Sequence, residues 1–207
     1  MTTVVIHNPD WFLNADIIFS AISIFVSLLV AIVAFRAWFV TRKTRYFGLC
    51  AAFTALAFAF FTRMIANIYQ DPLLFYIGYG LHILATIFAF LTLFILANRI
   101  SNPRIVLLFY LLVFPLIYYS GSYFMSFYVS TTIITGLLAL TYFQNILKSK
   151  KRKFSAICVF IAFLMLFLAH LQFLLSKFNH LFYISASVTQ LAGFILFLIT
   201  MIKVLKS

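Results

Sequence analysis

Three ionisable side chains stand inside long apolar runs of this sequence. Arg63 lies in FFTRMIAN, His82 in GLHILAT and His170 in FLAHLQFL. An ionisable group is costly in hydrocarbon unless it is paired or hydrated, so each one is a candidate for function. A guanidinium suits an anionic or polar ligand, whereas an imidazole can donate hydrogen bonds or ligate haem iron.

Uncharged polar residues accompany these three at a comparable depth. At about 1.5 Å per residue, Arg63 and His170 each lie on the order of 10 Å below the outer helix end, and His82 about 13 Å below. The candidate ligand-binding residues are Arg63, Asn67, His82, His170, Thr189 and Gln190. Two alternatives need no ligand: Arg63 can pair with Asp71 or Asp16, and each histidine can bond to a neighbouring helix.

The elements that must position these residues are membrane-spanning helices. Hydrophobic residues make up 66% of the 207 residues and charged ones only 9%, which predicts an all-α integral membrane protein forming a single transmembrane domain over residues 1–207. Apolar runs between charged or turn-forming residues predict seven spans: 16–40, 46–69, 73–97, 105–119, 123–147, 154–177 and 181–204.

The charges predict how these helices are oriented. Basic clusters at TRKTR, NRISNPR, KSKKRK and KVLKS occupy one set of loops, while Asp10, Asp16 and Asp71 fall in the other set. Because basic loops mark the cytoplasmic side, the N-terminus is expected outside and the C-terminus inside. The net charge of +12 is thus a topology signal that excludes nucleic acid as a partner. A multi-pass protein of the plasma membrane, surrounded by lipid, is expected.

The sequence also contains an internal repeat. At an offset of 107 residues the first three spans lie on the last three without a gap: Lys43 falls on Lys150, Arg63 on His170, His82 on Thr189, and LFYI at Leu74 on LFYI at Leu181. Repeat 1 covers about 16–97, a linker helix about 105–119 and repeat 2 about 123–204. Because one odd helix separates the halves, both should cross the membrane in the same direction.

This arrangement of three, one and three helices resembles the SWEET sugar transporters and the KDEL-receptor-like branch of the PQ-loop superfamily. The resemblance rests on topology along the whole chain. The Pro-Gln signature of that superfamily is absent, since Pro9, Pro72, Pro103 and Pro115 do not precede glutamine.

Missing residues disfavour several activities. The seventh span has no central lysine for a retinal Schiff base, and no carboxylate is expected deep in any span, which disfavours an aspartyl protease or a proton-coupled transporter. HExxH, GxSxG, Walker and CxxC motifs are absent, so no enzymatic activity is expected. Cys50 and Cys158 are expected to be buried hydrophobes and not a disulfide.

Three functional classes remain. The first is a transporter or receptor with an outward-facing polar pocket for a small anionic or polar ligand. The second is an accessory subunit that packs against other membrane proteins and uses its polar residues to hold its helices together. The third is an electron carrier in which His82 and His170 ligate haem b, with no other cofactor or metal expected.

Overall fold

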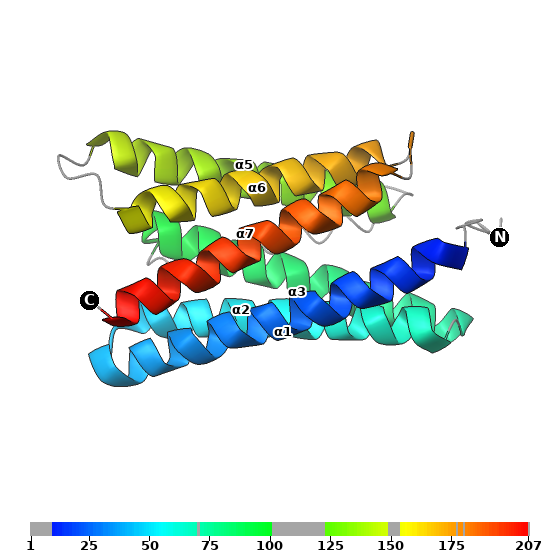
Figure 1. Ribbon diagram of the computed structural model, residues 1–207, viewed down its shortest axis with the longest axis horizontal. Coiled ribbons are helices and arrows are strands. Elements are labelled where there is room, and N and C mark those ends of the chain that lie inside the picture. Colours follow the sequence, from blue (N-terminus) through cyan, green and yellow to red (C-terminus); the bar gives the residue numbers. More distant parts are fainter. Residues whose placement is uncertain are drawn as a thin grey trace.

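The chain folds into long antiparallel and parallel helices (Figure 1). The computed structural model describes residues 10–69, 71–100, 123–148, 154–176, 178–179 and 181–206. These residues form six helices and no strand: α1 (Asp10–Thr41), α2 (Thr44–Tyr69), α3 (Pro72–Asn98), α5 (Tyr123–Lys148), α6 (Phe154–Leu175) and α7 (Leu181–Lys206). All six are long and apolar enough to cross a membrane, which indicates a multi-pass membrane protein.

The helix boundaries follow the turn residues of the sequence. Asp71 caps α3 by accepting hydrogen bonds from the Leu73 and Leu74 amides at 2.9 and 3.0 Å, and Pro72 takes the first helical position. The main difference from the prediction is at the first span, because α1 begins at Asp10 instead of Asp16. The predicted helix over 105–119 lies outside the described residues.

The described helices pack mainly in chain order. α1 packs against α2, α2 against α3, α3 against α5, α5 against α6 and α6 against α7, while α7 returns to α1. α1, α3, α5 and α7 run toward the end of the bundle that carries the C-terminus, and α2 and α6 run the opposite way (Figure 1). Helices from both ends of the sequence therefore meet side by side at the contact of α1 with α7.

Phenylalanine rings join the two halves of the bundle. Phe53 and Phe60 of α2 meet Phe194 of α7 with ring centroids 6.3 and 5.8 Å apart, and Phe53 also meets Phe197 of α7 at 5.4 Å. These edge-on contacts are the geometry that aromatic pairs prefer. Large apolar side chains such as Phe25 and Ile32 remain 63% exposed on the outside, where lipid would cover them.

A glycine brings α2 and α3 close together. A Cβ atom at Gly78 would lie 2.8 Å from the Thr62 carbonyl oxygen and 2.8 Å from the Ala66 Cβ. Only glycine allows this separation, because small residues let membrane helices approach closely. The close contact sets Tyr79 beside Asn67 and so positions the polar residues described below.

Candidate functional site

A buried ion pair joins α1 to α2. The Arg63 Nε donates to Asp16 Oδ2 at 2.9 Å, and a guanidinium NH2 group donates to Asp16 Oδ1. Two parallel bonds of this kind give an arginine–carboxylate pair both strength and a fixed orientation. Both side chains are buried, with Arg63 only 5% and Asp16 only 1% exposed.

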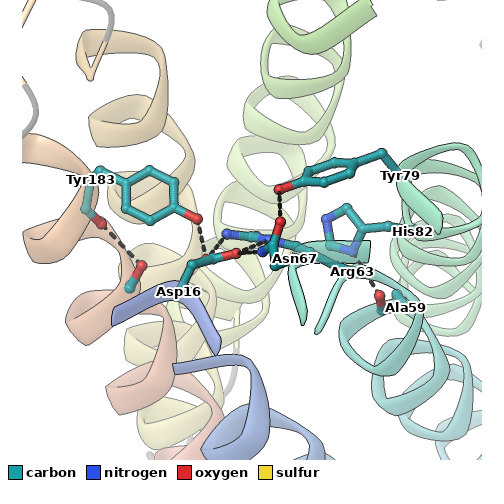
Figure 2. A network of polar contacts seen from close by, with 8 residues as sticks. Asp16, Ala59, Arg63, Asn67, Tyr79, His82 and Tyr183 are labelled. Carbon is teal, nitrogen blue, oxygen red and sulfur yellow. Dashed lines mark hydrogen bonds and ion pairs between the residues drawn. The ribbon is translucent and has the colours of Figure 1, made fainter. Parts of the chain in front are cut away.

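Polar groups from α2, α3 and α7 surround this pair. Asn67, one helical turn from Arg63, donates its amide to Asp16 and accepts a hydrogen bond from the Tyr79 hydroxyl at 2.9 Å. The Tyr183 hydroxyl donates to the other Asp16 oxygen, and the Arg63 guanidinium lies 5.5 Å from the centre of the Tyr183 ring. Figure 2 shows Arg63, Asn67 and Tyr183 meeting the Asp16 carboxylate, with Tyr79 bonded to Asn67 behind them.

The pair is electrically neutral as a unit. Removing two charges from water costs several kcal/mol per ion, and the mutual attraction offsets this cost only where the remaining polar groups are also satisfied. Asn67 and Tyr183 supply that satisfaction at Asp16. The positive charge of Arg63 is consequently compensated within the protein, and a ligand at this place would have to compete with Asp16.

His82 lies about one helical turn from Tyr79, toward the C-terminal end of α3, and is not bonded to the ion pair. Its Nδ1 is 3.0 Å from the Ala59 carbonyl oxygen of α2, and since a carbonyl only accepts, Nδ1 carries the proton of this bond. The rings of Phe60, Phe127 and Tyr79 have centroids 5.9, 5.6 and 6.4 Å from the imidazole. His82 thus ties α3 to α2 within an aromatic cluster.

His170 is bonded within its own helix. Its Nδ1 donates to the Leu166 carbonyl at 2.7 Å, and its ring packs 5.2 Å from Phe90 and 6.2 Å from Phe173. Phe173 in turn contacts the Tyr183 ring at 5.2 Å. A phenylalanine therefore connects His170 to the tyrosine that bonds Asp16.

The remaining candidates of α7 lie farther along that helix. The Thr189 hydroxyl donates to the Ser185 carbonyl at 2.7 Å, and the Gln190 side chain is buried. Gln190 follows Tyr183 by seven residues, which places it about 10 Å along the helix axis. Of the six predicted residues, Arg63 and Asn67 meet at one carboxylate, while His82, His170, Thr189 and Gln190 form hydrogen bonds or packing contacts elsewhere in the bundle.

Asp16 is the main correction to the sequence reasoning. The charge pattern assigned it to the outer loops and led to the expectation that no carboxylate lies deep in a span. Because α1 begins at Asp10, Asp16 lies about 9 Å along the helix and is buried. The absence of a buried carboxylate is therefore no longer an argument against proton-coupled transport. The alternative that paired Arg63 with Asp16 is confirmed, and Asp71 caps α3 instead.

The sequence reasoning also missed Tyr183. It belongs to the LFYI segment that begins α7, and a tyrosine close to the end of a membrane helix is usually an interfacial residue. Tyr76, the tyrosine of the LFYI segment in α3, is 77% exposed, whereas Tyr183 is only 7% exposed. The sequence signal available was the position of a hydroxyl near the start of the span, which does not distinguish these two outcomes.

The described residues contain no group of three or more His, Cys, Asp or Glu side chains arranged to hold a metal ion. No protein-family model, curated protein or solved structure matches this chain. Its function is therefore inferred from its own residues.

Proposed function

We propose that this protein is a membrane transporter or receptor whose ligand-binding site is built around the Asp16–Arg63 pair. The observation that carries the proposal is the buried Asp16 carboxylate of α1, which accepts bonds from α2 and α7, while Tyr79 of α3 bonds to Asn67 beside it. Ionisable residues inside a membrane bundle are rare and commonly mark a substrate or ion pathway. The ligand would be a small polar or anionic molecule that exchanges hydrogen bonds with Arg63, Asn67, Tyr79 or Tyr183.

Unpartnered polar atoms support a site of this kind. Ser27 Oγ, Thr86 Oγ1 and Gln172 Oε1 are buried and have no hydrogen-bond partner in the described part of the chain. Buried polar groups are normally bonded to protein, water or ligand, and each exception calls for an explanation. Water or a polar solute inside the bundle would supply partners that the protein itself does not provide.

The proposal includes the internal repeat and the seventh helix. Support comes from the burial of equivalent residues: Leu56 and Phe163, Arg63 and His170, and Phe90 and Phe197 are all buried at the offset of 107. Within each half the helices pack in chain order, and α1–α3 run in the same succession of directions as α5–α7 (Figure 1). Repeats related by an axis along the membrane normal occur among transporters, with the site between the halves.

The experiment that tests the ligand site is a thermal-shift screen of the purified protein with small polar, anionic and zwitterionic solutes. Each solute that stabilises the wild type is then titrated against Tyr79→Phe and Tyr183→Phe. Each variant removes a single hydroxyl at the ion pair, and a lost hydrogen bond should weaken the affinity about three- to tenfold.

Tyr142→Phe is the matched control. This tyrosine stacks on Phe163 with centroids 5.1 Å apart, away from the ion pair, and its substitution should leave the affinity unchanged. If no solute stabilises the wild type, or if all three variants bind equally well, the proposed site is wrong.

A second candidate is an accessory subunit of a membrane complex, and the ion pair favours it in one respect. Asp16 accepts bonds from Arg63, Asn67 and Tyr183, which is the arrangement expected of a clamp that holds helices together. Here the protein should be unstable when expressed without its partners. Monodisperse, stable protein in detergent would contradict the accessory role.

Haem ligation by His82 and His170 is not part of the proposal. The residues do not fit the group well, because each imidazole is flanked by phenylalanine rings between 5.2 and 6.2 Å away. A porphyrin would have to displace these rings from the bundle.

A further inference from the structure

The tight turn between α1 and α2 presents three exposed cations. α1 ends at Thr41 and α2 begins at Thr44, so Arg42 and Lys43 alone connect the two helices. Arg42 has a φ of 56° and its amide donates to the Trp38 carbonyl at 2.7 Å. Arg42, Lys43 and Arg45 are all exposed, at the end of the bundle that also carries the C-terminus (Figure 1).

Aromatic rings hold both arginines of this turn. The Arg42 guanidinium carbon lies 4.9 Å from the Phe39 ring centre and 5.8 Å from that of Trp38. The Arg45 guanidinium lies 4.8 Å from the Tyr46 ring centre and donates to the Tyr46 hydroxyl at 3.1 Å. Cation–π contacts restrict a guanidinium while leaving its remaining N–H groups available for an anion.

Within the described part of the chain, no aspartate or glutamate side chain pairs with these cations. The whole chain has three acidic residues and no glutamate. Asp16 is bound to Arg63, Asp71 caps α3, and Asp10 begins α1 at the helix end opposite the turn. The exposed cations of the turn are therefore available to an external anion.

The surroundings of the turn are apolar. Phe39 and Phe47 are 59% and 54% exposed, and Phe47 packs against Trp38 with ring centroids 5.3 Å apart. Aromatic rings beside basic residues are typical of the level at which lipid headgroups meet the acyl chains. A partner of this surface must therefore carry negative charge and an apolar part together.

We infer that the α1–α2 turn binds an anionic phospholipid, with its phosphate held by Arg42 and Arg45 and its upper acyl chain against Phe39 and Phe47. Guanidinium groups bind phosphate oxygens in a bidentate manner. The general bias of basic residues toward the cytoplasmic side explains why cations are present, but it does not require them to be held on aromatic rings. This inference is independent of the proposed function.

Trp38 provides a direct test because the chain has only two tryptophans. In the Trp11→Phe variant all tryptophan fluorescence comes from Trp38, in contact with Arg42. The variant is reconstituted in phosphatidylcholine vesicles that contain increasing fractions of brominated phosphatidylglycerol or brominated phosphatidylcholine, and quenching is measured. We expect phosphatidylglycerol to be preferred over phosphatidylcholine at least about fivefold, the factor one cation near an anionic surface typically contributes.

Two further variants in this background identify the turn as the site. Arg42→Gln with Arg45→Gln should abolish the preference, whereas Arg99→Gln should keep it, because Arg99 is also exposed and ends α3 at the same end of the bundle. If brominated phosphatidylglycerol and brominated phosphatidylcholine quench the Trp11→Phe variant equally, the inference is overturned, and an acidic protein segment is left as the partner. A preference that survives the double substitution would overturn it too.

Discussion

Asp16 and Arg63 compensate each other's charge in the buried interior of the bundle. Arg63 alone would be an uncompensated charge in a buried position, and Asp16 alone would be the same with opposite sign. Together they form two hydrogen bonds, and Asn67 and Tyr183 complete the coordination of the carboxylate. Breaking such a pair by removing one partner is far more destabilising than replacing both partners by apolar residues.

The first prediction at the residue scale follows from this difference. Arg63→Met should destabilise the protein by about 3–5 kcal/mol because Asp16 stays buried without a counter-charge. The double substitution Asp16→Leu with Arg63→Met should recover most of that loss. The free energy of unfolding is measured in mixed detergent micelles for the wild type, for Arg63→Met, for Asp16→Leu and for the double variant. These four values give the coupling energy between Asp16 and Arg63. Additive effects of the two single substitutions would contradict an ion pair in the membrane.

Tyr79→Phe and Tyr183→Phe test ligand binding, because each removes only one hydroxyl group. They preserve the ion pair and the aromatic packing of Tyr183 with Phe173, so a loss of affinity in them reports on hydrogen bonding and not on folding. The stability cycle and the ligand titration therefore separate the structural role of the pair from a functional one.

At the scale of elements, the contact between α2 and α3 decides where the site residues lie. α2 carries Arg63 and Asn67 on one face because they are four residues apart, and Gly78 lets α3 approach closely enough for Tyr79 to reach Asn67. About one helical turn from Tyr79, the bond between His82 and the Ala59 carbonyl also holds α2 and α3 together.

Gly78→Ala should therefore destabilise the protein, by about 1–3 kcal/mol, because the added methyl group meets the Thr62 backbone oxygen at 2.8 Å and the helices must separate. Gly80→Ala is the matched control on the same helix, since a Cβ there meets nothing within 4 Å. It should be neutral or stabilising by about 0.5–1 kcal/mol. Thermal unfolding in detergent measures both, and equal effects would contradict the close contact.

At the scale of the whole molecule, the two halves of the chain run in the same directions. α3 ends at the basic end of the bundle and α5 begins at the opposite end (Figure 1). Two repeats inserted in the same direction would place the α1–α2 and α5–α6 turns on the cytoplasmic side and the α2–α3 and α6–α7 turns outside.

This orientation predicts the accessibility of single cysteines in intact cells. In a Cys50→Ala, Cys158→Ala background, a membrane-impermeant maleimide should label Phe178→Cys and Pro72→Cys from outside. Lys43→Cys and Leu147→Cys should be labelled only after the cells are opened. Labelling of Pro72→Cys and Phe178→Cys from opposite sides would contradict the parallel repeat, and labelling of all four with reversed sidedness would contradict the orientation alone.

Apart from the start of α1, the sequence by itself determined where the described helices lie, because burial in lipid requires about twenty consecutive apolar residues and turns require Asp, Pro or Asn. The four-residue spacing of Arg63 and Asn67 also places them on one face of a helix. Only the tertiary structure decided that Asp16 and not Asp71 pairs with Arg63, that Tyr183 turns inward while Tyr76 stays exposed, and that the two histidines lie apart from the carboxylate. These outcomes depend on which helices are neighbours and how they are rotated, and the apolar composition of the described helices other than α2 is nearly uniform around their axes. Packing between helices sets both properties.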